Sequence, residues 1–170
     1  MKSPSFARLV LFCSLLCWCG LASANEMLDA DKSFKGGQYA EAMLQVEAWL
    51  AKNPKDAQGR FLKGLILTQE KKFPDAIEIF KALIEDYPEL PEPYNNLAVI
   101  YAAQGEYGRA KDELELAILA HPDYAAAHEN MGDIYARLAG QSYEKALKLD
   151  PSSIRTRAKL GLVNNSLFSR

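Results

Sequence analysis

The sequence holds few of the residues that build catalytic or metal sites. Its 170 residues include three cysteines, all between positions 13 and 19, and two histidines, His121 and His128. Cleavage after residue 24 would leave no thiol for disulfide, nucleophile or metal chemistry. The histidines are seven residues apart, whereas a zinc pair on a helix needs a spacing of about one turn. Phosphate-loop, dinucleotide-binding and nucleophile-elbow motifs are absent as well. We therefore expect no enzyme activity, no cofactor and no metal.

The chain also lacks a basic excess and a long apolar run. Its net charge is −2, with no basic stripe of the kind that binds phosphate backbones, so we expect no nucleic-acid partner. The apolar run over residues 9–22 follows Lys2 and Arg8 and ends at Ala22-Ser23-Ala24. This pattern predicts a cleavable secretory signal peptide over residues 1–24. An uncleaved anchor is the alternative, but the run is shorter than the roughly 20 residues of a membrane-spanning helix.

The most informative feature that is present is a constant interval between prolines. Pro54, Pro88 and Pro122 are equally spaced, each near the end of a short amphipathic segment. Proline ends a helix because it lacks the amide donor and clashes with the preceding turn. A fixed period of about 34 residues is typical of helical-repeat solenoids, which present extended surfaces to other molecules.

Small and aromatic residues recur in the same register. Two antiparallel helices approach closely only where a side chain is tiny, so we expect Gly or Ala at the two crossing positions of each repeat. An aromatic residue should fill the wedge between neighbouring helix pairs. The residues that we expect to make this repeat packing are Ala42, Gly64, Ala76, Ala98, Tyr107, Ala110 and Gly132.

These positions resemble the signature of the tetratricopeptide repeat family. The third repeat matches best, through Leu97, Ala98, Tyr101, Gly105, Tyr107, Ala110, Ala117 and Pro122. The resemblance implies an all-α fold, a right-handed α-solenoid of antiparallel helix pairs in one domain. It also implies a noncatalytic protein that binds other proteins.

The period divides the chain into about 4.5 repeats. We expect a solenoid over residues 25–164, with units at about 25–56, 57–90, 91–124 and 125–153, then a capping helix over 154–164 and a frayed tail over 165–170. The fourth unit is shortened, because Pro151 follows Pro122 five positions sooner than the period requires. We expect its second helix to survive as a short piece over about 142–149.

In the family, the first helix of each unit lines a concave groove. The resemblance therefore implies a peptide- or protein-binding surface here, apolar toward its N-terminal end and acidic toward its C-terminal end. Such a gradient suits a peptide with a hydrophobic part and a basic part. The alternative is that the apolar residues belong to the core and that the acids are ordinary solvated surface. The groove candidates are Met27, Phe34, Phe61, Leu65, Thr68, Asn95, Asn96, Val99, Glu129, Asn130 and Asp133.

The signal peptide and the repeat together predict a periplasmic or secreted adaptor or scaffold in a Gram-negative bacterium. Relatives with this combination often serve cell-envelope assembly or secretion, which is an expectation from the resemblance alone. Two alternatives stay open: a self-assembling structural protein, so that a homo-oligomer is possible, and a noncatalytic subunit of an envelope enzyme complex.

Overall fold

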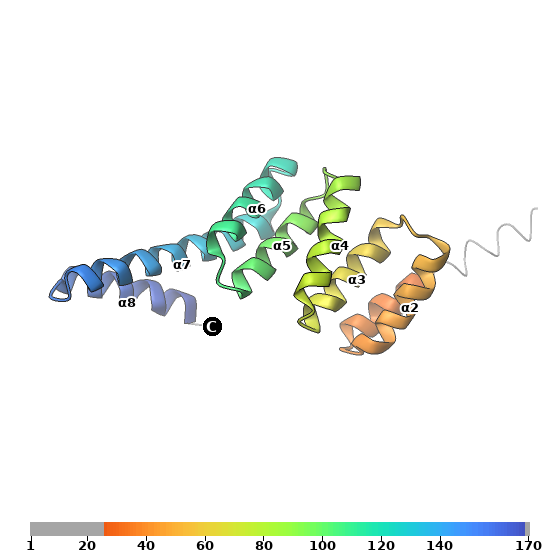
Figure 1. Cartoon of the computed structure of the whole chain (residues 1–170), viewed down its shortest axis with the longest axis horizontal. Coiled ribbons are helices and arrows are strands. Elements are labelled where there is room, and N and C mark those ends of the chain that lie inside the picture. The colour runs from red at the N-terminus through yellow and green to blue at the C-terminus, as the bar shows by residue number, and fades with distance from the viewer. Residues whose placement is uncertain (1–25, 169–170) are drawn as a thin grey trace, which may run out of the picture. The chain divides into compact units, whose positions relative to one another are not determined.

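The computed structural model describes residues 26–168, and every regular element in that range is an α-helix. A helix over residues 26–35 comes first. It is followed by α2 (Tyr39–Lys52), α3 (Ala57–Gln69), α4 (Phe73–Asp86), α5 (Pro91–Ala103), α6 (Tyr107–Ala120), α7 (Ala125–Leu149) and α8 (Ile154–Phe168) (Figure 1). The all-α prediction is confirmed. The predicted signal peptide, residues 1–24, lies outside the described residues.

The helices form two compact units, which divide inside α4, between Ile79 and Phe80. In the first unit, α2 packs against α3. The centre of this unit is a cluster of side chains that burial removes from water, which is the main favourable contribution to folding. Its buried members are Met27, Ala30, Ala42, Val46, Leu62 and Ile66.

The connection from α2 to α3 is fixed by the side chain of Asp56. Its Oδ2 atom accepts a hydrogen bond from the Gly59 backbone N–H at 2.7 Å and another from Trp49 Nε1 at 2.9 Å. The first of these bonds caps the otherwise unpaired amides at the start of α3. A Cβ atom on Gly59 would lie 2.9 Å from Trp49 Cδ1. Glycine is therefore needed where the indole crosses the start of the helix.

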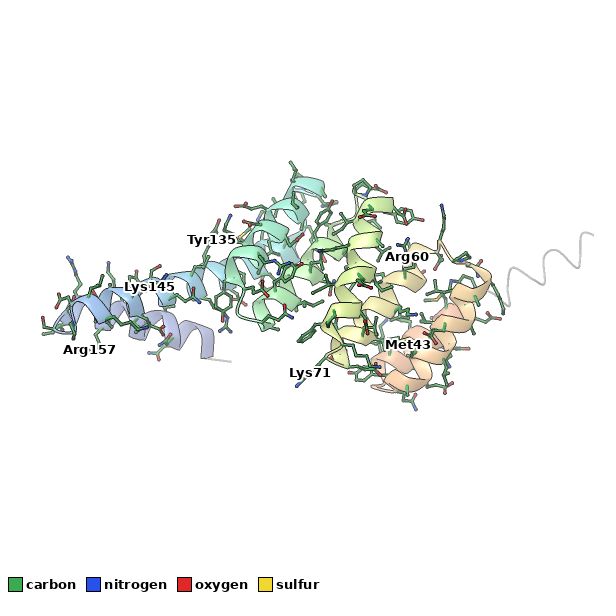
Figure 2. All side chains as sticks on the ribbon, in the orientation of Figure 1. Met43, Arg60, Lys71, Tyr135, Lys145 and Arg157 are labelled. Carbon is green, nitrogen blue, oxygen red and sulfur yellow. The ribbon has the colours of Figure 1, made fainter. Side chains whose placement is uncertain are left out.

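The tight turns inside the first three repeats share one backbone geometry. Gly37, Lys71 and Gly105 occupy the same position in successive repeats and have φ angles of 74°, 59° and 78°. In each turn the following amide donates back to a carbonyl five residues earlier, as Glu106 N does to Tyr101 O at 2.9 Å. This is the hydrogen-bond pattern that ends a helix through a left-handed residue. Lys71 (Figure 2) is the one non-glycine with positive φ among the described residues.

In the second unit, α5 packs against α6, α6 against α7, and α7 against α8. Tyr101 of α5 is 1% exposed, and the guanidinium carbon of Arg109 on α6 lies 3.9 Å from the centre of its ring. This stacking ties the two helices together through a cation–π contact. The other large, fully buried side chains of this unit are Phe80, Leu83, Pro93, Leu97, Ile100 and Leu114.

The fourth repeat differs from the sequence prediction. Instead of two helices, residues 125–149 form the single helix α7, 25 residues long. The turn that closes a repeat is preserved: Asp150 N donates to Ala146 O, as His121 N donates to Ala117 O at the end of the repeat before. The five missing residues have instead removed the internal turn, because Ala139 stands where Gly105 stands one repeat before and is helical. The last helix, α8, also runs to Phe168, beyond its predicted end at residue 164.

Most of the predicted packing residues lie in the interior. Ala42, Ala76, Ala98 and Ala110 are at most 2% exposed. Gly64 is buried on α3 and Tyr107 is half-buried at the start of α6.

Gly132 is the exception, and its predicted packing role is wrong. It is exposed, and a Cβ added to it would meet no atom within 4 Å. The reason is that α7 runs straight on, so no second helix of the same repeat returns to cross it. The buried glycine of α7 is Gly140, where an added Cβ would lie 3.7 Å from Val163 Cγ1 of α8.

Candidate functional site

In the first unit, the predicted groove residues belong mostly to the edge of the core. Met27 is 6% exposed and is a member of the core cluster, which leaves it little surface for a partner. Phe34 and Leu65 are half-buried and pack against the same cluster. Phe61 is also half-buried. Thr68 donates its hydroxyl hydrogen to Gly64 O at 2.8 Å, so its polar group serves its own helix.

In the second unit, two predicted groove residues bind each other. Asn130 Nδ2 on α7 donates to Asn95 Oδ1 on α5 at 2.8 Å, and Asn95 is 8% exposed. The pair is 35 residues apart in sequence and connects the first helices of neighbouring repeats. A third residue, Asn96, donates its amide to Glu92 O of its own helix at 2.9 Å. Asn130 also lines a pocket.

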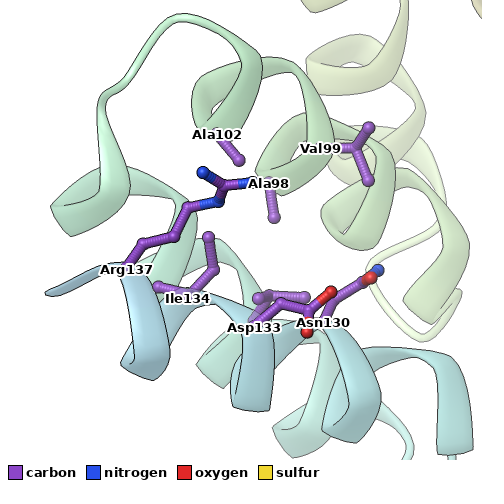
Figure 3. Close-up of a pocket in the computed structure, with 8 residues that line it drawn as sticks. Ala98, Val99, Ala102, Asn130, Asp133, Ile134 and Arg137 are labelled. Carbon is purple, nitrogen blue, oxygen red and sulfur yellow. The ribbon is translucent and has the colours of Figure 1, made fainter. Parts of the chain in front are cut away.

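This pocket lies between α5 and α7 and has a volume of about 190 Å³ (Figure 3). Helix α5 contributes Ala98, Val99 and Ala102. Ala102 follows the other two by about one turn, so all three lie on one broad face of the helix. On the rim, Val99 is 43% exposed and Asp133 is exposed. The remaining lining residues are Leu114 of α6 and Asn130, Ile134 and Arg137 of α7.

The two ends of the pocket carry opposite charge. Arg137 reaches from α7 toward Ala98 and Ala102 of α5, whereas Asp133 lies beside Asn130 (Figure 3). The Arg137 guanidinium carbon is 5.7 Å from the centre of the Tyr107 ring, which holds the cation at the pocket wall. Glu129, one turn before Asp133 on α7, is exposed. Of the two predicted acids, Asp133 therefore lines the pocket, and Glu129 lies one turn before it on the same helix.

Behind the pocket, α6 carries a carboxyl group with a shifted pKa. Glu113 is half-buried beside Leu114, and burial raises its pKa, while Lys81 and Arg109 offset part of that rise. Desolvation favours the neutral form of an acid, and nearby cations favour the charged form. Glu113 does not line the pocket, so its titration bears on the stability of α6 rather than on binding chemistry.

Among the pocket residues that the sequence did not single out are Leu114, Ile134 and Arg137. Arg137 follows Asp133 by four residues, and side chains at that spacing lie on the same helix face. That spacing is the signal that could have identified Arg137. Ile134 and Leu114 follow the apolar pattern of any buried helix face, and this pattern does not distinguish the floor of a pocket from ordinary core.

Two negative findings concern only the described part of the chain. Within residues 26–168, no group of three His, Cys, Asp or Glu side chains is placed to hold a metal ion. In the same range, no helix combines the length and the apolar composition that crossing a membrane requires.

Comparison with protein families gives two matches, both to models described as tetratricopeptide repeat. They cover residues 30–91 and 67–134, and together they span more than half of the chain.

Among curated proteins, the chain is similar to Photosystem I assembly protein Ycf3 of Cyanophora paradoxa. The two are 36% identical over 84 residues, which is 48% of this chain and 49% of that protein. It is also similar to the chloroplastic tetratricopeptide repeat domain-containing protein PYG7 of Arabidopsis thaliana. Here the identity is 28% over 102 residues, which is 55% of this chain and 34% of PYG7. The chain thus spans between a third and a half of the length of these relatives.

Among solved structures, the fold is similar to TTC0263, a thermophilic TPR protein of Thermus thermophilus. The TM-score is 0.66 at 23% identity, covering 86% of this chain and 83% of that one.

Proposed function

Because the chain belongs to the tetratricopeptide repeat family, we propose that it is a noncatalytic adaptor that binds a protein or peptide through the pocket between α5 and α7. The family assignment supports protein binding as the general activity. The observation that carries the location is the open pocket itself, which combines an apolar interior with one charge of each sign at its ends. Recognition sites of this make-up bind through buried apolar contact and select through a few polar groups.

A photo-crosslinker placed at Val99 tests this location. Val99 is 43% exposed and lines the pocket, whereas Leu119 on α6 is 78% exposed, does not line it and is a matched control. With extract of the source organism, the Val99 variant should yield a specific adduct and the Leu119 variant should not. A second substitution, Ala102→Leu, fills the pocket and should abolish the Val99 adduct. An adduct that persists in this double variant, or that forms only from Leu119, would contradict the proposed location.

We also propose that the protein works outside the cytoplasm, in the periplasm of a Gram-negative bacterium, in cell-envelope assembly or secretion. The support is the N-terminal pattern of Lys2 and Arg8, the apolar run over 9–22 and the small residues at 22–24. Expressed as the full chain with a C-terminal tag, the exported protein should begin at Asn25 by N-terminal sequencing. A replacement Ala24→Lys should block processing. A product that retains Met1 in the cytoplasmic fraction would contradict export.

Self-assembly is a second candidate function, favoured by exposed apolar side chains near the connection of α7 to α8. Leu149 and Ile154, which flank this connection, are 89% and 79% exposed. Large apolar side chains exposed on a surface can mark association sites. Light scattering across a dilution series tests this candidate, because a monomer at every concentration would contradict self-assembly.

A further inference from the structure

The pocket between α5 and α7 has an interior that suits one apolar side chain. Ala98, Leu114 and Ile134 are 2%, 0% and 4% exposed, so its deep wall presents methyl and methylene groups. An apolar cavity of about 150 Å³ accommodates a benzene ring, and this pocket measures about 190 Å³. Drug-sized ligands need roughly 300–1,000 Å³. The size therefore fits a single side chain such as Leu, Met or Phe, supplied by a larger molecule.

We call the apolar side chain that would fill the pocket the anchor. The charges around the opening favour one orientation of the molecule that carries it. Asp133 lies at one end of the pocket, and the exposed Glu129 lies one turn earlier on the same face of α7. Arg137 lies at the other end, where the Tyr107 ring covers part of its guanidinium group. A cationic residue beside the anchor is attracted at the acidic end and repelled at the Arg137 end. The Arg137 guanidinium group can donate hydrogen bonds to backbone carbonyl oxygens of a peptide that lies along the opening.

From these observations we infer that the partner is an extended peptide with one medium-sized apolar side chain in the pocket and a basic residue next to it, facing Asp133 and Glu129. This inference rests on the proposed function, because it names the chemistry of the partner that the same pocket would bind. It excludes peptides in which the residue that faces Asp133 and Glu129 is acidic, and peptides whose anchor is only alanine.

Selection of short random peptides by the full chain provides the probe. Selected peptides should share a Leu, Met or Phe next to an Arg or Lys. In the synthetic form of the strongest binder, exchange of the anchor for alanine should weaken the affinity by about tenfold or more, because burial of such a side chain contributes at least this much. Ala102→Leu in the protein should cause a similar loss by filling the pocket. Val99→Gln, which makes the exposed rim polar without adding charge, is a second variant in case Ala102→Leu disturbs folding, and it should also weaken binding.

The charge pairing has its own test. Asp133→Asn should weaken the peptide with the basic neighbour and leave a version with glutamine at that position nearly unchanged. Asp123→Asn, at an exposed position before α7, is the matched control and should change neither affinity.

Three results would overturn the inference. They are selected peptides whose affinity is insensitive to both Ala102→Leu and Val99→Gln, selected peptides that lack a basic residue next to the anchor, and no selection of any peptide. None of these results removes the proposed adaptor function, which depends on the crosslink formed from Val99. Conversely, loss of that crosslink would contradict the adaptor function whatever peptides were selected.

Discussion

The third and fourth repeats place equivalent residues in opposite surroundings. Tyr101 and Tyr135 occupy the same position in successive repeats, yet they are 1% and 53% exposed. Ala98 is 2% exposed, whereas its counterpart Gly132 is exposed with open space around it. The third repeat has a complete second helix, α6, and the fourth does not, because α7 continues through the position where the chain should turn. Figure 2 labels Tyr135 on this uninterrupted helix.

The comparison shows that the first helix of a repeat packs through two independent faces. One meets the second helix of the same repeat, and the other meets the preceding repeat. The face of α7 that would meet its own second helix has lost that partner and holds Gly132 and Tyr135. The face that meets the preceding repeat is intact: Ile134 is 4% exposed, and Asn130 binds Asn95 of α5. The shortened repeat has therefore kept the face of α7 that forms the pocket with α5. It has lost the helix that would cover the opposite face.

The largest expected effect separates the two tyrosines. Tyr101→Ala should lower the free energy of unfolding by about 3–5 kcal/mol, because it empties a fully buried aromatic site. Tyr135→Ala should change it by about 0.5 kcal/mol or less, as for most surface positions. Urea denaturation of both variants, followed by circular dichroism, gives the two values. Similar losses for the two variants would show that the repeats are packed alike.

A second prediction concerns the close approach of α5 and α6. Ala110 is 0% exposed, so Ala110→Leu should overpack this helix pair and destabilise the protein by about 1–3 kcal/mol. The control is Ala146→Leu at an exposed position of α7, which should be close to neutral. A melting temperature unchanged by Ala110→Leu would contradict the repeat register.

The third prediction is that exchanging glycine and alanine at equivalent positions changes stability in opposite directions in the fourth and third repeats. Gly132→Ala should stabilise the protein by about 0.5–1 kcal/mol, since glycine is unfavourable within a helix and the added methyl group meets nothing. Ala98→Gly should destabilise by at least a similar amount, because it also removes a buried methyl group. Destabilisation by Gly132→Ala would mean that another helix does cross α7 at this point.

The smallest expected effect is a pH dependence of stability that comes from Glu113, in the complete third repeat. Burial raises the pKa of Glu113, so the folded protein binds this proton more tightly than the unfolded chain. Its contribution to stability is therefore most favourable below the ordinary glutamate range and declines as the pH rises through the raised pKa. Glu113→Gln should increase the melting temperature at neutral pH by a small amount, since the side chain is only half-buried. This gain should shrink as the pH falls.

The control for this pH series is Glu144→Gln, at an exposed position of α7. A gain from Glu113→Gln that stays constant across the pH range would contradict desolvation of the Glu113 carboxylate as its cause.

Much of the fold could be predicted because the constant interval between repeats fixes where helices end. The helix over 26–35 and α2 lie within the predicted first unit, α3 and α4 within the second, and α5 and α6 within the third. The prolines and the turn glycines carry this information locally. Lys71 adopts the same left-handed turn without glycine, which shows that the surrounding repeat can impose that conformation on a residue that does not favour it.

The site was less predictable, because burial depends on what neighbouring helices cover. Met27 and Asn95 occupy groove positions in the repeat register, yet both are enclosed by their neighbours. Gly132 matches the packing signature, but the helix that should cross it is missing. Deletion of five residues could have produced either a short second helix or a continuous one. Ala139, a good helix former at the former turn position, favours the continuous helix.

The most direct test of the account is hydrogen exchange of the full chain with and without the strongest selected peptide. The account predicts that the peptide slows exchange mainly at residues 98–102 of α5 and 130–137 of α7, which line the pocket. Slowed exchange confined to residues 26–70, or to the exposed face of α6 around Leu119, would contradict the claim that this pocket is the binding surface.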